Sequence, residues 1–254
     1  MKTDNADLGE EFVLQTDRLC KQYRGSAALD QVSLHIPRGA IYGFVGRNGA
    51  GKTTLMRLIS GLQEPTRGSY RLFGIENGQR EICLARRRMG AVIETPAIYP
   101  EMTAGENVRN QCLLLGISGG EEAERVLTLV GLQQTGKKRA GHFSLGMRQR
   151  LAIALALVGN PEFLILDEPM NGLDPQGIHE MRALLWRLNR DDGVTILISS
   201  HMLDELARLA THYGFLDHGR LLREMSAEEL RAACGGGEDL EEYFIQLVGG
   251  GYDA

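Results

Sequence analysis

The stretch that most constrains the fold is a glycine-rich loop between an apolar run and a helical pattern. The run Ala40–Val45 is typical of a buried strand, and Leu55–Ile59 is typical of a helix. The loop between them has the spacing G-x-x-x-x-G-K-[ST] and reads Gly46-Arg47-Asn48-Gly49-Ala50-Gly51-Lys52-Thr53-Thr54. Strand, loop and helix in this order are the context in which the motif binds phosphate. The alternative is a glycine-rich turn without a ligand, which chance supplies in on the order of one chain in a hundred.

The chemistry of such a loop rests on its backbone and on one cation. Glycines let successive N–H groups approach phosphates closely, and the helix N-terminus adds donors and a partial positive charge. Lys52 would reach the β- and γ-phosphates, and the hydroxyl of Thr53 would ligate Mg²⁺. The residues predicted to hold the nucleotide are Gly46, Asn48, Gly49, Ala50, Gly51, Lys52, Thr53 and Thr54.

Composition limits the classes that remain. The 254 residues suffice for one large domain, with or without a subdomain. The formal net charge of −5 argues against nucleic acid as a partner. The longest wholly apolar run, Leu151–Val158, is far shorter than the roughly 20 residues that span a bilayer. Any membrane role is therefore expected to come through a partner. The cysteines have no metal-ligand spacing and indicate a reducing compartment.

Strand and helix patterns alternate over most of the chain. Phe12–Cys20 and Leu29–Ile36 are predicted to be antiparallel strands, and the run 163–168 is predicted to be a buried parallel strand that ends in two carboxylates. From Met102 to about Asn160 no strand is predicted, and Thr103 begins a capping-box pattern. The predicted fold is α/β with a mostly parallel sheet, an N-terminal antiparallel β part and an α-helical subdomain.

Polar residues follow several of the predicted parallel strands. Because ligands bind at the carboxyl ends of such strands, Glu94, Asp167, Glu168 and His201 are expected to lie at one site with the phosphate loop. Asp167 suits Mg²⁺, and Glu168 is placed to orient the water that attacks the γ-phosphate. His201 would stabilise the γ-phosphate or position that water. The alternatives are turn carboxylates and a capping or surface histidine, and they stay open at this point.

A second anion site is predicted away from the phosphate loop. Ser144 stands at the start of a helix predicted over Met147–Val158, where N–H groups have no partners within the helix. This site lies in the helical subdomain, so it need not face the phosphate loop of its own chain. A partner chain could bring the two sites together.

Together these motifs resemble the ATP-binding cassette (ABC) family. The resemblance rests on five motifs in the family's order, and it covers about Phe12 to Leu247: Gly46–Thr54, Ser144–Arg150, Leu164–Glu168, Gly172-Leu173-Asp174 and His201. It implies a P-loop ATPase fold, ATP and Mg²⁺ as ligands, and head-to-tail pairing with a second ATPase subunit. Residues 1–232 would form the ATPase domain, with a helical subdomain inserted at about 96–160, and residues 233–254 a short C-terminal helix and tail.

The resemblance also implies further roles. Ser144 and Gly146 would contact the γ-phosphate bound to the other subunit, and Asp174 would lie in a loop that communicates between the two sites. Tyr23 would stack on adenine, with an ordinary turn tyrosine as the alternative. Glu94 would ligate the metal together with Thr53 and Asp167. The loop from Thr95 to Glu106 would dock onto a separate transmembrane permease subunit, with packing inside the helical subdomain as the alternative.

Two departures from the family's usual motifs narrow the resemblance to a subgroup. The family's signature is usually L-S-G-G-Q, whereas the equivalent here is Phe143-Ser144-Leu145-Gly146-Met147. The strand that ends near Ile93 is usually followed by glutamine, whereas Glu94 stands here. Both departures resemble cassettes of bacitracin-type and lantibiotic-type exporters. The prediction is therefore the ATPase subunit of a drug or antimicrobial-peptide exporter, peripheral on the inner face of the plasma membrane.

Other classes of protein fit less well. A DNA-repair or chromosome-structure ATPase needs a long coiled coil between phosphate loop and signature, and Thr54–Ser144 has no sustained heptads. A ribosome-binding translation factor needs two cassettes in one chain. A P-loop kinase would leave the signature and His201 unexplained.

Overall fold

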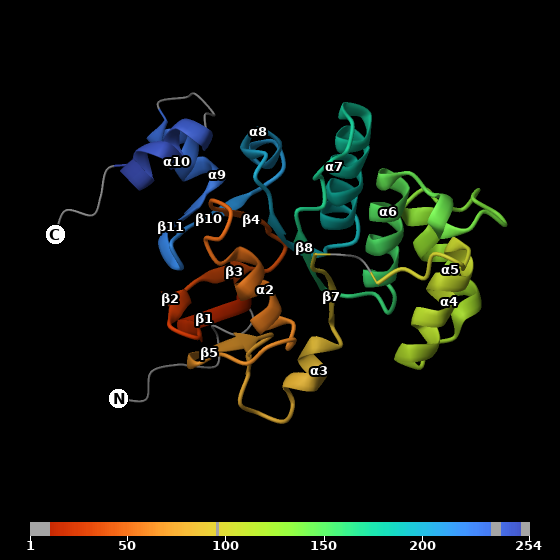
Figure 1. Cartoon of the computed structure of the whole chain (residues 1–254), viewed down its shortest axis with the longest axis horizontal. Helices are drawn as coiled ribbons and strands as arrows, with labels where there is room; N and C mark the ends of the chain where they lie inside the picture. Colours follow the sequence, from red (N-terminus) through yellow and green to blue (C-terminus); the bar gives the residue numbers. More distant parts are fainter. Residues whose placement is uncertain (1–10, 95–96, 235–239, 250–254) are drawn as a thin grey trace. The chain divides into compact units, whose positions relative to one another are not determined.

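A computed structural model describes residues 11–94, 97–234 and 240–249, which fall into two compact units (Figure 1). Unit 1 comprises residues 1–86 and 195–254, and unit 2 comprises residues 87–194. Within the described ranges no helix combines the length and apolar character that crossing a membrane requires. The sequence Gly235-Gly236-Gly237 predicts a short flexible joint, and these residues lie outside the described ones.

The elements of unit 1 come from both ends of the chain. They are β1 Phe12–Tyr23, β2 Ser26–Val32, β3 His35–Pro37, β4 Ile41–Val45, α2 Lys52–Ile59, β5 Arg67–Leu72, β6 Ile75–Glu76, α3 Ile82–Arg86, β9 Thr195–Ser199, α8 Leu203–Ala207, β10 His212–Asp217, β11 Arg220–Ser226, α9 Ala227–Ala233 and α10 Leu240–Gly249. An antiparallel sheet has the order β2-β1-β5-β6, with β3 also paired to β1. In a second sheet, β4 pairs in parallel with β9 and β10, and β11 pairs antiparallel with β10.

Strand β4 leads into the phosphate loop and has no exposed residue. A parallel strand covered on both faces has such a continuous apolar sequence. Gly43, in its middle, makes room for the helix that follows β9, since a Cβ there would lie 3.0 Å from Leu206 and 3.1 Å from Ala210. Helix α8 therefore packs closely against the strand that carries the phosphate loop.

The prediction of a single strand over Leu29–Ile36 is wrong, because this segment forms two strands. Strand β2 ends at Val32 and β3 begins at His35. The buried side chain of Thr16 occupies the break: its Oγ1 donates to the carbonyl of Val32 and accepts from the N–H of Leu34, each at 2.9 Å. A hydroxyl that replaces ladder hydrogen bonds in this way has no periodic signature in the sequence.

Unit 2 contains one strand pair and the longest of the described helices. Its elements are β7 Met89–Val92, α4 Ala104–Leu115, α5 Gly119–Leu129, the 3-10 turn Ala140–His142, α6 Leu145–Ala156, β8 Phe163–Asp167 and α7 Pro175–Arg190. Strands β7 and β8 are parallel. The predicted capping box is confirmed: Thr103 Oγ1 accepts from the N–H of Glu106 at 3.2 Å, and the carboxylate of Glu106 accepts from the N–H of Thr103 at 2.7 Å.

Two predicted helix starts are wrong. The helix after Ser144 begins at Leu145 rather than at Met147, because the Ser144 side chain already caps it. The sequence Ser199-Ser200-His201 also predicts a cap for the helix after β9, but α8 begins at Leu203 without a side-chain cap. Instead, Ser200 Oγ accepts from the N–H of Met202 at 2.9 Å and closes a turn ahead of the helix.

A polar cluster in unit 1 joins residues that are far apart in the sequence. The Glu224 carboxylate accepts from the buried Tyr42 hydroxyl at 2.8 Å and from the N–H of His35 at 2.8 Å. It also lies 3.2 Å from Nδ1 of His35. The hydrogen bond to Glu224 raises the pKa of His35, whereas burial raises the pKa of Tyr42, with Glu224 adding to the effect.

We expect the His35–Glu224 pair to stabilise unit 1 mainly at acidic pH. A histidine pKa that is raised on folding contributes fully below the unfolded value of about 6.5 and loses its contribution as pH rises through the folded value. Since the pair is partly exposed, the effect should be about 0.5 kcal/mol, or roughly 1–2 °C in Tm. The Tm difference between wild type and His35→Gln should therefore be larger at pH 5.5 than at pH 8.

The comparison with His35→Gln is needed because folding shifts the pKa of a second histidine in the opposite direction. Burial lowers the pKa of His212, so its contribution is lost as pH falls. The effect of His212 is common to both proteins and cancels in the difference. An equal Tm difference at both pH values would contradict the assignment to His35.

Candidate active site

The phosphate loop of unit 1 runs from the end of β4 to the start of α2. Two of its glycines are required sterically, since a Cβ on Gly46 would lie 2.5 Å from the carbonyl oxygen of Leu216, and one on Gly51 would lie 2.4 Å from that of Ala28. Gly51 is the N-cap of α2, with φ 111°, and no side chain caps the helix. Because the N-cap is a glycine, no N-cap side chain occupies the start of α2, and an anion can approach the helix N-terminus there.

Lys52 places the cation of the loop. The residue is 6% exposed, and its ammonium donates to the carbonyl oxygens of Gly46 and, at 3.2 Å, of Arg47. The ammonium therefore lies against the phosphate loop and does not extend into solvent. A buried ammonium gains from an arriving polyphosphate, because an anion compensates its charge better than carbonyl dipoles do.

His201 lies at the same sheet edge as the phosphate loop. Strands β4 and β9 pair in parallel, with Phe44 opposite Ser199. Gly46 follows Phe44 by two residues, and His201 follows Ser199 by two. Both therefore emerge at the carboxyl ends of neighbouring strands, where ligands bind in parallel sheets. The His201 side chain is exposed.

Tyr23 ends β1 in the antiparallel part of unit 1. Its ring is 38% exposed, and its hydroxyl donates to the side chain of Gln63. The ammonium of Lys21 lies 5.4 Å from the ring centroid. Both contacts hold the ring in place while leaving part of it accessible. Gln63 has no motif that would have identified it as the partner of Tyr23.

Three carboxylates of the prediction lie in unit 2 at the ends of β7 and β8. Val92 pairs with Leu166, and Glu94 and Glu168 each follow this pair by two residues. Both glutamates have left-handed backbone conformations, with φ 59° for Glu94 and 51° for Glu168. Such φ values are uncommon for residues other than glycine and cluster at functional sites. Asp167, half-buried, is the last residue of β8.

The start of α6 carries the second predicted anion site. Ser144 is its N-cap and accepts from the N–H of Met147 at 3.3 Å. Leu145, which stands in place of a glycine, is the first residue of the helix and therefore has an ordinary helical backbone. The leucine does not need the conformational freedom of glycine, so its N–H remains directed along the helix axis.

Asp174 has a structural role that the sequence did not indicate. It is the N-cap of α7 and accepts from the N–H of Gly177 at 2.9 Å. The turn before it contains Gly172 with φ 72°. A Cβ on Gly172 would lie 2.9 Å from Cδ2 of Leu145, which brings the start of α6 into contact with this turn.

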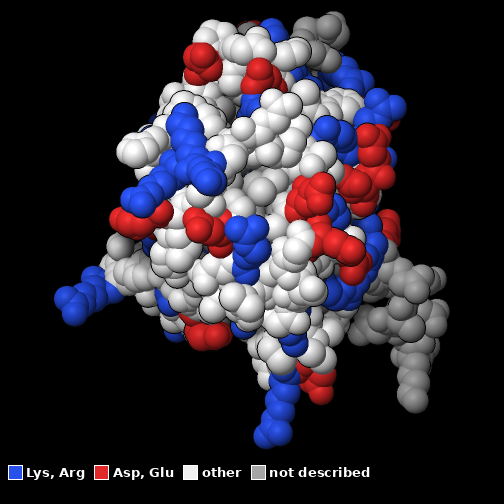
Figure 2. All heavy atoms as spheres, turned by 90° about the vertical axis from the view of Figure 1, so that its right-hand side faces the viewer, with Lys and Arg blue, Asp and Glu red and all other residues white. Residues whose placement is uncertain are grey.

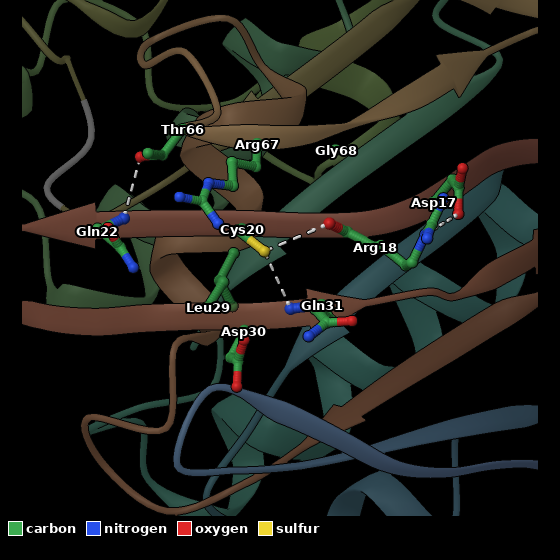
Figure 3. A pocket seen from close by; sticks show the side chains of 10 residues that line it. All are labelled: Asp17, Arg18, Cys20, Gln22, Leu29, Asp30, Gln31, Thr66, Arg67 and Gly68. Carbon is green, nitrogen blue, oxygen red and sulfur yellow. Dashed lines mark hydrogen bonds and ion pairs between the residues drawn. The ribbon is translucent and has the colours of Figure 1, made fainter.

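Two cavities lie near these residues. In unit 2, a groove of about 360 Å³ is lined by residues that include Glu94, Ile98, Pro100, Leu145, Arg148 and Gln149. In the antiparallel part of unit 1, a cavity of about 290 Å³ is lined by Asp17, Arg18, Cys20, Gln22, Leu29, Asp30, Gln31, Thr66, Arg67 and Gly68 (Figure 3). There the N–H of Gln31 donates to Sγ of Cys20 at 3.2 Å. None of the residues predicted to bind nucleotide lines this second cavity.

Within each unit, therefore, the structure groups part of the predicted site. Unit 1 holds the phosphate loop, Tyr23 and the strand end that carries His201. Unit 2 holds Glu94 and Glu168 at paired strand ends, together with the caps Ser144 and Asp174.

Comparison with known proteins identifies the family. The ABC transporter family matches residues 29–171. The bacitracin transport ATP-binding protein BcrA of Bacillus licheniformis is 45% identical over 219 residues, which is 86% of this chain and 71% of that protein. The lantibiotic transport ATP-binding protein SrtF of Streptococcus pyogenes is 39% identical over 236 residues, 93% of this chain and 97% of that protein.

A solved structure gives the same answer for the fold. A dimeric ATP-binding cassette in a post-hydrolysis state, bound to ADP and Pi, superimposes with a TM-score of 0.75 at 28% identity, covering 84% of this chain and 98% of that one. The predicted P-loop α/β fold and the predicted family are both confirmed. The chain belongs to the ABC transporter family, and it is an ATP-binding, ATP-hydrolysing subunit of that family.

Proposed function

We propose that this chain powers a membrane exporter of antimicrobial peptides or drugs, as a head-to-tail dimer bound to a separate permease on the inner face of the plasma membrane. The observation that carries the proposal is the similarity to bacitracin and lantibiotic transport ATP-binding proteins over 86–93% of the chain. The departures at Leu145 and Glu94 support the same subgroup. The direct test is whether a polytopic membrane protein co-purifies with the chain, and isolation without one would contradict the proposal.

The nucleotide would be held mainly by unit 1. The phosphate loop would cradle the phosphates through Gly46, Asn48, Gly49, Ala50, Gly51 and Thr54, with Lys52 compensating the β- and γ-charges. Tyr23 would stack on the adenine. Ser144 and Gly146 of the second subunit would contact the γ-phosphate from the other side, and Asp174 would lie in the loop between the two sites.

Mg²⁺ fits the donors that the chain offers. Thr53, Asp167 and Glu94 supply only oxygen, the ligand type that this hard cation prefers. The described residues contain no cluster of three His, Cys, Asp or Glu side chains. Mg²⁺ is usually bound by one or two carboxylates plus substrate phosphates, and Asp167 and Glu94 would supply the two carboxylates. When bound, the ion would neutralise charge on the β- and γ-phosphates.

Hydrolysis would depend on two residues with different tasks. Glu168 would orient and polarise the attacking water, and its left-handed backbone sets its direction at the end of β8. His201 would stabilise the γ-phosphate or the same water from the end of β9. Glu94 would serve the metal rather than the water.

The permease would dock on the groove beside Glu94. The loop at 99–103 is held by the buried Asn107, whose Nδ2 donates to the carbonyls of Tyr99 and Thr103 at 3.1 and 3.0 Å. The loop is thus fixed from beneath while Tyr99 stays 48% exposed. A fixed loop with an exposed aromatic next to a groove fits a protein partner. Thr95 and Pro96 lie outside the described residues.

The alternative is a non-transport ABC ATPase that acts in DNA repair or translation. Between α2 and Ser144, the longest described helix is α4 with 12 residues, too short for the coiled coil of a chromosome-structure ATPase. On the face shown in Figure 2, basic and acidic side chains are interspersed rather than gathered into one basic field. The helix length argues against a chromosome-structure ATPase, and the face shown carries no single basic field of the kind that binds nucleic acid.

We expect Glu168→Gln to bind ATP and barely hydrolyse it. The amide cannot take a proton from the attacking water, so the rate should fall by ~10²–10⁴-fold. ATP should then hold two copies together, which sedimentation would detect. Glu162→Gln is the matched control, because Glu162 precedes the opposite end of β8, where it pairs with Arg88. Turnover near the wild-type rate in Glu168→Gln would refute the assignment.

We expect Tyr23→Ala to weaken ATP binding more than it slows hydrolysis. A base stacked on an aromatic side chain is worth about 1–3 kcal/mol, so Kd should rise roughly 5- to 150-fold. Tyr23→Phe keeps the ring and loses the hydrogen bond to Gln63, so it should bind ATP almost normally. Binding is measured by titration of the purified chain. An unchanged Kd in the alanine variant would show that Tyr23 does not stack on adenine and is an ordinary structural tyrosine.

We expect Tyr99→Glu to weaken assembly with the permease. A charge buried in the interface without a partner should lower the co-purified permease by about tenfold or more. Leu113→Glu, at an exposed site near the end of α4, is the control and should assemble normally. Circular dichroism of each purified variant checks its fold. Equal assembly of both variants would place the docking site elsewhere.

A further inference from the structure

The start of α6 and the turn before α7 interlock through two leucines and two glycines. A Cβ built on Gly172 would lie 2.9 Å from Cδ2 of Leu145, and one on Gly146 would lie 3.6 Å from Cδ2 of Leu173. Each leucine therefore packs where the opposite residue has no side chain. All four residues belong to unit 2.

The turn that Leu145 contacts begins at Glu168. The N–H of Asn171 donates to the carbonyl of Glu168 at 3.1 Å, and the N–H of Leu173 donates to that of Met170 at 3.2 Å. Glu168 and Gly172 both have left-handed conformations, with φ 51° and 72°. For Glu168, which has a Cβ, this conformation is sterically unfavourable. A cost of this kind persists only where the surrounding structure determines the conformation.

Three contacts can hold this turn. Its beginning is fixed by β8, which pairs with β7 through Leu166 and Val92. Its end is fixed by Asp174, the N-cap of α7. Between these ends, the side chain of Leu145 packs against Gly172. Leu145 thus restrains the middle of the segment that sets the direction of Glu168.

Leu145 also lines the groove that contains Glu94, Ile98 and Pro100. One side chain therefore borders both the groove and the turn after Glu168. A ligand or partner segment that enters this groove and displaces Leu145 would also change the packing on Gly172. A glycine at this position, as in the usual signature, has no side chain to make either contact.

We propose that Leu145 is a positioning residue for hydrolysis: it holds the turn 168–174 so that Glu168 points at the attacking water, and it links that turn to the groove. The proposal rests on the proposed role of Glu168. Because Leu145 acts on the hydrolytic step rather than on nucleotide binding, its loss should lower kcat and leave KM for ATP nearly unchanged.

The first experiment measures ATP hydrolysis by the purified full chain over a range of ATP concentrations. Leu145→Ala removes the contact and keeps a good helix former at the start of α6, so kcat should fall by about tenfold with a nearly unchanged KM. Leu145→Met conserves volume and should restore kcat to within about threefold of wild type. A change in KM alone, or a methionine variant no better than alanine, would overturn the proposal.

The second experiment is a double-mutant cycle with Gly172→Ala. In the wild-type background the new methyl group meets Leu145, so kcat should fall. In the Leu145→Ala background that contact is absent, so the same substitution should cost less, although the backbone strain at φ 72° remains in both. If Gly172→Ala lowers kcat by the same factor in both backgrounds, the two residues act independently and the proposal is overturned.

Glu168→Gln, measured in parallel, distinguishes a failure of the role proposed for Glu168 from a failure of the role proposed for Leu145. Normal hydrolysis in Glu168→Gln would refute the role of Glu168 itself. An inactive Glu168→Gln together with an additive cycle would refute only the positioning role of Leu145. Thermal unfolding of each variant identifies any loss of kcat that comes from an unfolded fraction.

Discussion

The burial of β4 on both faces is the constraint on which the catalytic half of unit 1 depends. With no exposed residue between Ile41 and Val45, the strand cannot accommodate charge along its length. Polar chemistry must therefore begin where the strand ends. There the chain turns through glycines into α2, whose N-cap is Gly51 and therefore has no capping side chain. Parallel pairing with β9 then carries His201 to the same edge.

The same logic operates in unit 2 with carboxylates in place of a phosphate loop. Strands β7 and β8 are parallel and in register, so the residues that follow them emerge side by side. Left-handed backbone at Glu94 and Glu168 turns the chain sharply at that edge. Both acidic residues thus stand directly after a paired strand, in a backbone conformation that the surrounding structure must support. This is consistent with a site in which the direction of a carboxylate matters as much as its charge.

The contact between Leu145 and Gly172 gives a physical account of the departure from the usual signature. Leucine at the first position of α6 keeps an ordinary helical backbone, so the N–H groups at the start of the helix keep their direction. Its side chain adds a contact that glycine lacks, against the turn after Glu168 and along the groove beside Glu94. Leucine in place of glycine therefore adds side-chain contacts to the start of α6 and leaves its backbone N–H donors unchanged.

Local signals determined much of this protein. The phosphate loop, the capping box at Thr103 and the β10–β11 hairpin each depend on neighbours within a few residues, and all three were predictable. Only the tertiary structure decided contacts between distant positions. Glu224 binds His35 from 189 positions away, Thr16 fills the break between β2 and β3, and Leu145 meets Gly172. Such contacts depend on which surfaces the fold brings together, and a single sequence carries no periodic signal for them.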